Sequence, residues 1–107
     1  LWIADNYMKA NPVAAMASNC GLTERSFHTR FKRATGMSPM DYVQTVRIEE
    51  AKQLLETSEM PLDEVAAEVG YAEPASFRRL FGRMVGVTPS TYRRQHLPVN
   101  LSIREAN

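Results

Sequence analysis

The chain has 107 residues, 44% hydrophobic and 23% charged, a composition typical of one small globular domain with a core of its own. The single cysteine excludes a disulfide framework and a cysteine-rich zinc site. We expect no membrane span, because the sequence has no apolar run of roughly 20 residues. We expect no signal peptide, because the sequence has no basic segment followed by an apolar one at its start. The formal net charge of +1 gives by itself no reason to expect a nucleic-acid partner.

The first predicted element is a leading helix over Leu1–Ala10, with Trp2, Ile3 and Tyr7 packing inward. The chain starts within this pattern, without a methionine or a helix cap. We therefore expect it to be a fragment of a longer protein.

Two short helices follow, each with its own start and stop signals. Asn11 and Pro12 suit the N-cap and the first position of one helix, and Gly21 suits its end. Thr23 can cap the next helix, which ends at Gly36. The inner faces of the two helices are predicted to consist of Val13, Met16, Ala17 and Cys20, then Phe27, Phe31 and Ala34. A short helix, a glycine-containing turn and a second helix form a helix-turn-helix.

A longer helix is predicted over Pro39–Thr57. Ser38 is its expected N-cap, and Asp41 stands where a capping-box acid would stand. The apolar face of this helix is predicted to comprise Val43, Val46, Ala51, Leu54 and Leu55. At about 1.5 Å per residue the helix would be roughly 28 Å long.

The segment that starts at Pro61 repeats the segment that starts at Pro12, with an offset of 49 residues up to Gly70 and of 50 beyond it. A second helix-turn-helix is therefore predicted. Its inner residues would be Leu62, Val65, Ala66, Val69, Phe77, Phe81 and Met84. A last short helix is predicted over Pro89–Gln95.

No alternating strand pattern occurs, so the predicted fold class is all-α. Residues 1–37 form the first helix-turn-helix subdomain, 38–58 the linker helix, and 59–96 the second subdomain. Residues 97–107 are a C-terminal tail, which we leave unassigned.

The second helix of each pair presents a basic outward face. With Phe27 inward and about 100° per residue, the outward positions are Arg25, Thr29 and Lys32, flanked by His28 and Arg33. With Phe77 inward, they are Ala75, Arg79 and Gly82, flanked by Arg78 and Arg83. Residues 25–33 and 74–104 contain no acid, whereas residues 49–73 contain eight acids and one lysine. The small net charge therefore hides two basic segments around an acidic one.

Such faces are suited to double-stranded DNA. Arginine can hydrogen-bond guanine in the major groove, threonine and alanine can contact a thymine methyl, and other basic side chains can bind phosphates. Successive major-groove faces on one side of the duplex lie roughly 34 Å apart. A linker helix of the predicted length could hold two recognition helices in adjacent grooves.

A helical protein-interaction domain is the alternative, because the acidic segment could bind a basic partner. An enzyme has little support: Cys20 and His28 have no third group at triad spacing, and neither a phosphate loop nor a metal-ligand cluster occurs. No cofactor is expected.

Three segments resemble the DNA-binding domain of the AraC/XylS family of bacterial transcription regulators. They are GLTERSFHTRFKRATGMSPMDYV, RIEEAKQLLE and VAAEVGYAEPASFRRLFGRMVGVTPSTYRR, in this order. The resemblance covers residues 1–95 and implies seven helices in two homeodomain-like helix-turn-helix subdomains joined by a linker helix. It also implies sequence-specific promoter binding that activates, or less often represses, transcription through contact with RNA polymerase.

The resemblance assigns roles to individual residues. The base contacts it implies are Arg25, His28 and Thr29 from the first recognition helix, and Ala75, Arg78 and Arg79 from the second. The expected phosphate contacts are Thr23, Lys32, Arg33, Ser76 and Arg83. Two positions depart from the family: Thr29 stands where arginine is common, and Gly82 stands where lysine or arginine is common.

The resemblance also places the chain within a longer protein. The segments RSFHTRFK and ASFRRLF are most similar to the subgroup with an amidase-like, class I glutamine amidotransferase-like N-terminal domain. Effector sensing and dimerisation would then belong to a domain outside this chain. The expected location is the bacterial cytoplasm, at the nucleoid.

Overall fold

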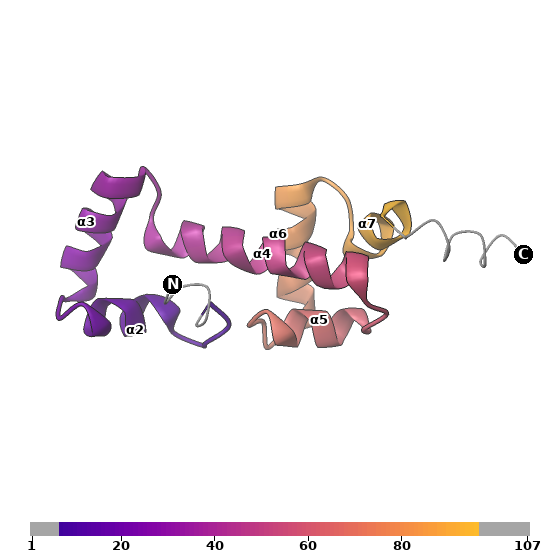
Figure 1. The fold of residues 1–107 in the computed structure, drawn as a ribbon, viewed down its shortest axis with the longest axis horizontal. Coiled ribbons are helices and arrows are strands. Elements are labelled where there is room, and N and C mark those ends of the chain that lie inside the picture. The colour runs from indigo at the N-terminus through magenta and orange to yellow at the C-terminus, as the bar shows by residue number, and fades with distance from the viewer. Residues whose placement is uncertain (1–6, 97–107) are drawn as a thin grey trace, which may run out of the picture. The chain divides into compact units, whose positions relative to one another are not determined.

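The structure is a computed structural model that describes residues 7–96, and within them it is helical without a strand (Figure 1). The helices are α2 (Pro12–Asn19), α3 (Glu24–Thr35), α4 (Pro39–Thr57), α5 (Leu62–Glu68), α6 (Pro74–Val85) and α7 (Pro89–Gln95). The all-α prediction is confirmed, and the predicted bounds of α4 and α7 are those observed. The predicted leading helix lies mostly outside the described residues, and residues 7–10 form turns and bends.

The chain divides into two compact units, and the border falls inside α4 between Arg47 and Ile48. The first unit contains α2, α3 and the start of α4, and the second contains the rest of α4 with α5, α6 and α7. No helix within the described residues is both long and apolar enough to span a bilayer.

In the first unit, the helix starts follow the predicted signals. The side chain of Thr23 accepts a hydrogen bond from the Ser26 amide (3.1 Å), and Ser38 Oγ accepts one from the Asp41 amide (3.1 Å). Asn11 occupies the N-cap position of α2 without a side-chain hydrogen bond. The core cluster comprises Met16, Ala17, Phe27 and Val43, with Tyr7, Val13, Leu22 and Phe31 packed against it.

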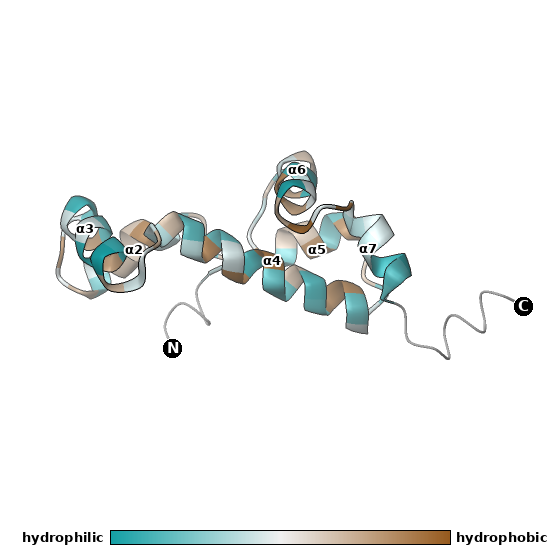
Figure 2. Ribbon diagram, turned by 90° about the horizontal axis from the view of Figure 1, so that it is seen from above, coloured by the Kyte–Doolittle hydropathy of each residue, from teal (hydrophilic) through white to brown (hydrophobic). Residues whose placement is uncertain are grey.

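The second unit repeats this arrangement over a larger core. Its buried hydrophobic side chains are Ile48, Ala51, Leu55, Val65, Ala66, Val69, Phe77, Leu80, Phe81 and Tyr92. Figure 2 shows hydrophilic and hydrophobic stretches alternating along α4, as expected of a helix with one face in a core. Gly86, at φ +93°, ends α6 in the left-handed conformation, as Gly36 at +81° ends α3.

The same aromatic arrangement joins α3 to α4 and α6 to α7. The rings of Phe31 and Tyr42 meet edge-on, with centroids 5.6 Å apart and an interplanar angle of 74°. At the matching positions of the second unit, Phe81 and Tyr92 meet at 5.6 Å and 76°. The repeat seen in the sequence is therefore a repeat of packing geometry.

Three predicted core positions are wrong, because Cys20, Ala34 and Met84 are exposed. Cys20 follows the last residue of α2, so the helical period no longer directs its side chain. Ala34 and Met84 occupy matching positions in the last turns of α3 and α6, next to the glycines that end these helices.

The side chain of Arg47 is buried, with 4% of its surface exposed, and its partners are backbone carbonyls. Its Nε donates to the Tyr7 carbonyl at 2.7 Å and its Nη2 to the Lys9 carbonyl at 2.9 Å. A buried guanidinium requires acceptors, and two carbonyls of the segment before α2 provide them. This contact fastens that segment to α4.

Candidate nucleic-acid interface

The outer face of α3 is exposed and basic. Arg25, Ser26, Thr29, Arg30 and Arg33 line an open hollow along this helix. Thr23 caps the helix at its start and Gly36 ends it, so the basic side chains stand on twelve residues of regular helix. The hydroxyl of Thr29 donates to the Arg25 carbonyl at 3.1 Å, which leaves its oxygen lone pairs available to a partner.

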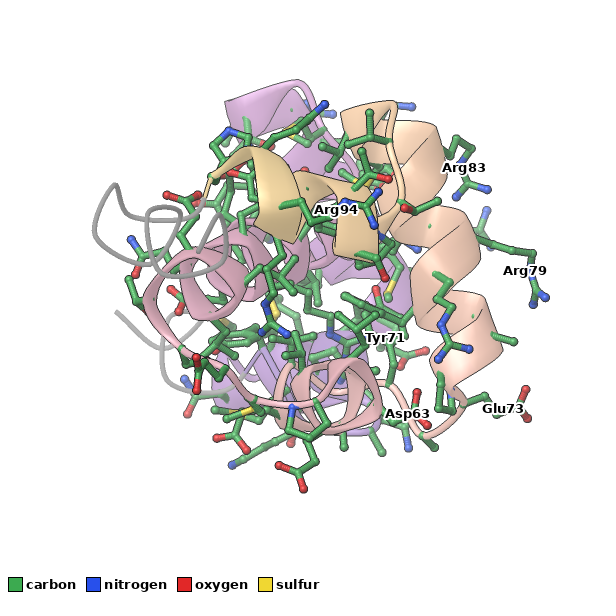
Figure 3. All side chains as sticks on the ribbon, turned by 90° about the vertical axis from the view of Figure 1, so that its right-hand side faces the viewer. Asp63, Tyr71, Glu73, Arg79, Arg83 and Arg94 are labelled. Carbon is green, nitrogen blue, oxygen red and sulfur yellow. The ribbon has the colours of Figure 1, made fainter. Side chains whose placement is uncertain are left out.

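The outer face of α6 carries two arginines that extend away from the unit. Figure 3 shows Arg79 and Arg83 projecting outward from this helix. Arg79 Nη2 lies 3.4 Å from Ser76 Oγ, a long contact within the same helix that leaves most of the guanidinium donors available. Gly82 is part of the regular helix, and a Cβ placed there would meet nothing within 4 Å.

Arg78 is held differently from Arg79. Its Nη2 lies 2.6 Å from Oδ1 of Asp63, a residue of the first turn of α5. The ion pair thus joins the two helices of the second helix-turn-helix.

Most of the predicted contact residues are exposed. These are Thr23, Arg25, His28, Thr29, Lys32, Arg33, Ala75, Arg78, Arg79 and Arg83, whereas Ser76 is half-buried. The structure brings Arg25, Thr29 and Arg33 together around the hollow on α3. The hydroxyls of Thr23 and Ser76 each accept a hydrogen bond within their own helix-turn-helix.

Two residues of these surfaces, Arg30 and Asp63, were not among the predicted contacts. Arg30 lines the hollow on α3, although the helical period places it to the side of the outward positions. Its membership of the acid-free segment is the only signal that could have indicated it. Asp63, the partner of Arg78, had no such signal, because an acid in the first turn of a helix is common for reasons of helix stability.

Arg93 and Arg94 make different contacts, although they are neighbours in the sequence. Arg93 is half-buried, and its Nε donates to the Leu55 carbonyl at 3.2 Å, so it joins α7 to α4. Arg94 is exposed, and its Nη2 contacts Thr91 Oγ1 at 3.3 Å.

Comparison with known proteins identifies this architecture. Residues 16–95 match the helix-turn-helix domain family. The chain is 36% identical over 80 residues to the MmsAB operon regulatory protein of Pseudomonas aeruginosa, covering 75% of this chain and 26% of that protein. It is 33% identical over 95 residues to the probable transcriptional regulator LumQ of Photobacterium leiognathi, covering 84% of this chain and 38% of that protein.

Solved structures show the same fold. The DNA-binding domain of the global transcriptional factor AdpA, in complex with a target DNA, is 33% identical with a TM-score of 0.82, covering 88% of this chain and 85% of that one. The C-terminal domain of the response regulator yesN from Fusobacterium nucleatum is 28% identical with a TM-score of 0.82, covering 85% and 89%.

The chain spans only about a quarter to two fifths of the two regulators that it matches. The family match nevertheless covers most of this chain, from α2 to α7. The chain therefore belongs to the AraC-type helix-turn-helix domain family, a family of DNA-binding domains found in transcription regulators.

Proposed function

We propose that the chain binds promoter DNA in a sequence-specific way, by inserting α3 and α6 into adjacent major grooves. The observation that carries this proposal is the repeated scaffold. At matching positions of the two units, α3 and α6 have the same length, and the side chains on their exposed faces are mostly basic or small. One such face is common on any surface, but two on repeated helix-turn-helix units favour DNA.

Direct base contacts are proposed for Arg25, His28 and Thr29 of α3 and for Ala75, Arg78 and Arg79 of α6. Arginine can form a bidentate pair with guanine, and the small side chains allow close approach to the base edges. Lys32, Arg33 and Arg83 would bind phosphates. Thr23 and Ser76, near the N-termini of the two recognition helices, would contact phosphates there.

Residues 38–58, which contain α4, would serve as the linker between the two subdomains at residues 1–37 and 59–96. The acidic side chains between residues 49 and 73 would lie away from the phosphates, where repulsion is weakest. This segment is also the basis of the alternative, a protein-interaction domain. The exposed basic faces of α3 and α6 support DNA instead.

In the intact protein, we infer that this domain activates, or less often represses, transcription through contact with RNA polymerase, in the bacterial cytoplasm at the nucleoid. A preceding domain would sense an effector and form a dimer. The amidase-like type of N-terminal domain is the one that the segments around Phe27 and Phe77 favour.

Selection of bound sequences from a random pool of DNA, followed by footprinting, tests the proposal. We expect one enriched sequence with two protected major-groove patches about one helical turn apart. Affinity should fall steeply with salt, as release of counterions from phosphates requires. Enrichment of no sequence at protein concentrations that saturate non-specific DNA would overturn sequence-specific binding, and a single protected patch would overturn the use of both helices.

A further inference from the structure

The ion pair between Asp63 and Arg78 places a carboxylate beside a recognition helix, where DNA phosphates would be expected to disfavour it. The Asp63 side chain is 66% exposed and that of Arg78 is 51% exposed. Figure 3 shows Asp63 on α5 near the start of α6. An ion pair this exposed contributes little to the free energy of unfolding. Its larger effect is on the orientation of the Arg78 side chain.

The geometry fixes the direction of the Arg78 side chain. A guanidinium has five N–H donors in a rigid plane, and the carboxylate of Asp63 at 2.6 Å engages Nη2. The other donors remain available in an orientation that the pair determines. A side chain ordered before binding loses less conformational freedom when it contacts a base.

The pair also changes what Arg78 can bind. The negative charge of Asp63 partly neutralises the arginine, which weakens attraction to any nearby phosphate equally on every sequence. Directed hydrogen bonds to a base edge depend on geometry more than on net charge. An arginine held by a carboxylate is therefore better suited to reading a base than to binding the backbone.

Within residues 7–96, neither the neighbouring arginine nor the first unit has a matching ion pair. The hydrogen bond of Arg79 is to Ser76 of its own helix, at 3.4 Å. In the first unit, the offsets of the repeat place Ala14 and His28 where the second unit has Asp63 and Arg78, and alanine cannot form an ion pair. The two recognition helices are thus prepared for DNA in different ways.

We propose that Asp63 is a positioning residue that orients Arg78 and so sets the base preference of the second recognition helix. This proposal rests on the proposed DNA-binding function. Asp63 itself contacts no base in it, and acts only through the guanidinium.

The test compares D63N with the matched variant E64Q, which removes the same charge at the next position of α5. The site selected by the unaltered protein and a scrambled duplex give a ratio of affinities for each variant. For D63N we expect this ratio to fall roughly twofold to fivefold, because the exposed pair cannot order Arg78 by more than about 1 kcal/mol. For E64Q we expect it to change by less than about twofold.

Repeated selection and a double variant separate positioning from a general charge effect. D63N should lose base preference at the same positions as R78A, and D63N combined with R78A should lose no more than R78A alone. D63E should restore part of the preference, because it returns the carboxylate. Thermal unfolding of D63N close to that of the unaltered protein excludes misfolding as the cause.

The outcomes are distinguishable. If the unaltered protein selects no sequence, the proposed function fails and this proposal fails with it. The proposed role of Asp63 is overturned, while the DNA-binding function stands, if the unaltered protein selects a site and D63N keeps the same base preference. It is also overturned if D63N lowers the affinity ratio as much in the R78A background as in the unaltered protein. A higher specificity ratio for D63N would make the pair a restraint on binding and would also overturn the proposal.

Discussion

The Tyr92 hydroxyl donates a hydrogen bond to the Glu56 carboxylate, which fastens α7 to the last turn of α4. Burial is the main reason why the pKa of Tyr92 rises to about 12, and the hydrogen bond and negative charge of Glu56 and the charge of Glu49 raise it further. The ring of His96 stacks on that of Tyr92 with centroids 3.9 Å apart. We therefore expect this corner of the second unit to lose stability at alkaline pH.

The stability of the protein should depend on Tyr92 between pH 10 and pH 12. Tyrosine in an unfolded chain has a pKa of about 10, so above that pH the unfolded state loses the proton before the folded state does. The free energy of unfolding should then fall by up to about 1.4 kcal/mol per pH unit. Urea unfolding at pH 8, 10 and 11 measures this, with Y92F expected to show a smaller fall. Equal falls in Y92F and the unaltered protein would contradict the expectation.

Replacing Arg47 by alanine should destabilise the first unit by about 2–3 kcal/mol, because the Tyr7 and Lys9 carbonyls lose their charged donors. The measurement is urea unfolding at neutral pH. Arg30, which is exposed on α3, provides the control, and R30A should change the free energy of unfolding by less than about 0.5 kcal/mol. Similar losses in the two variants would mean that the hydrogen bonds of the buried Arg47 contribute little to the free energy of unfolding.

Gly82 and Gly86 should respond to alanine in opposite directions. Gly82 lies inside α6 with open space around the position of a Cβ, so G82A should stabilise the protein by about 0.5–1 kcal/mol. Gly86 has φ +93°, where a Cβ is strained, so G86A should destabilise it by about 1–2 kcal/mol. Thermal unfolding distinguishes the two, and a loss of stability in G82A would show that the glycine has a packing role.

Phe81 and Met84 should differ sharply although both belong to the predicted inner stripe of α6. Phe81 is fully buried, and F81A should cost about 3–5 kcal/mol. Met84 is 42% exposed, and M84K should change the free energy of unfolding by less than about 0.5 kcal/mol. Chemical unfolding of both variants checks this. A large loss of unfolding free energy in M84K would show that the Met84 side chain belongs to the core.

Replacing Arg79 by alanine should weaken binding to the selected site by about 1–3 kcal/mol and relax the preference at one base pair. K52A, which removes one positive charge from α4, is the control and should leave the preference intact. Binding to the selected site and to scrambled DNA is measured for both variants. An equal loss on every sequence would make Arg79 a phosphate contact.

The sequence could predict the helices and most of the core, because proline, glycine and hydroxyl caps act locally and the Phe27 and Phe77 stripes follow the helical period. It could not predict how far a neighbouring element covers a stripe, which is why Ala34 and Met84 were placed in the core wrongly. Whether an inner side chain is buried depends on where the neighbouring helices end in the folded structure. The hydrophobic pattern of one helix does not contain this tertiary information.

The partners of long charged side chains were equally out of reach. Arg47 reaches carbonyls 38 and 40 residues away, and Arg78 reaches a carboxylate 15 residues away. The helical period indicates which face such a side chain leaves from, but a flexible arginine can reach several acceptors. The faces of α3 and α6 were therefore predictable, and the hydrogen-bond networks on them were not.

The rings of Phe31 and Tyr42 meet in the same geometry as those of Phe81 and Tyr92, so the two units share the packing of their inner faces. The inner residues of each unit determine its packing, while the outer residues of α3 and α6 differ freely between the units. Exchanging outer residues between the helices should therefore transfer base preference without rebuilding the core. A repeated unit of this kind can differ on its outer face while it keeps the packing of its inner face.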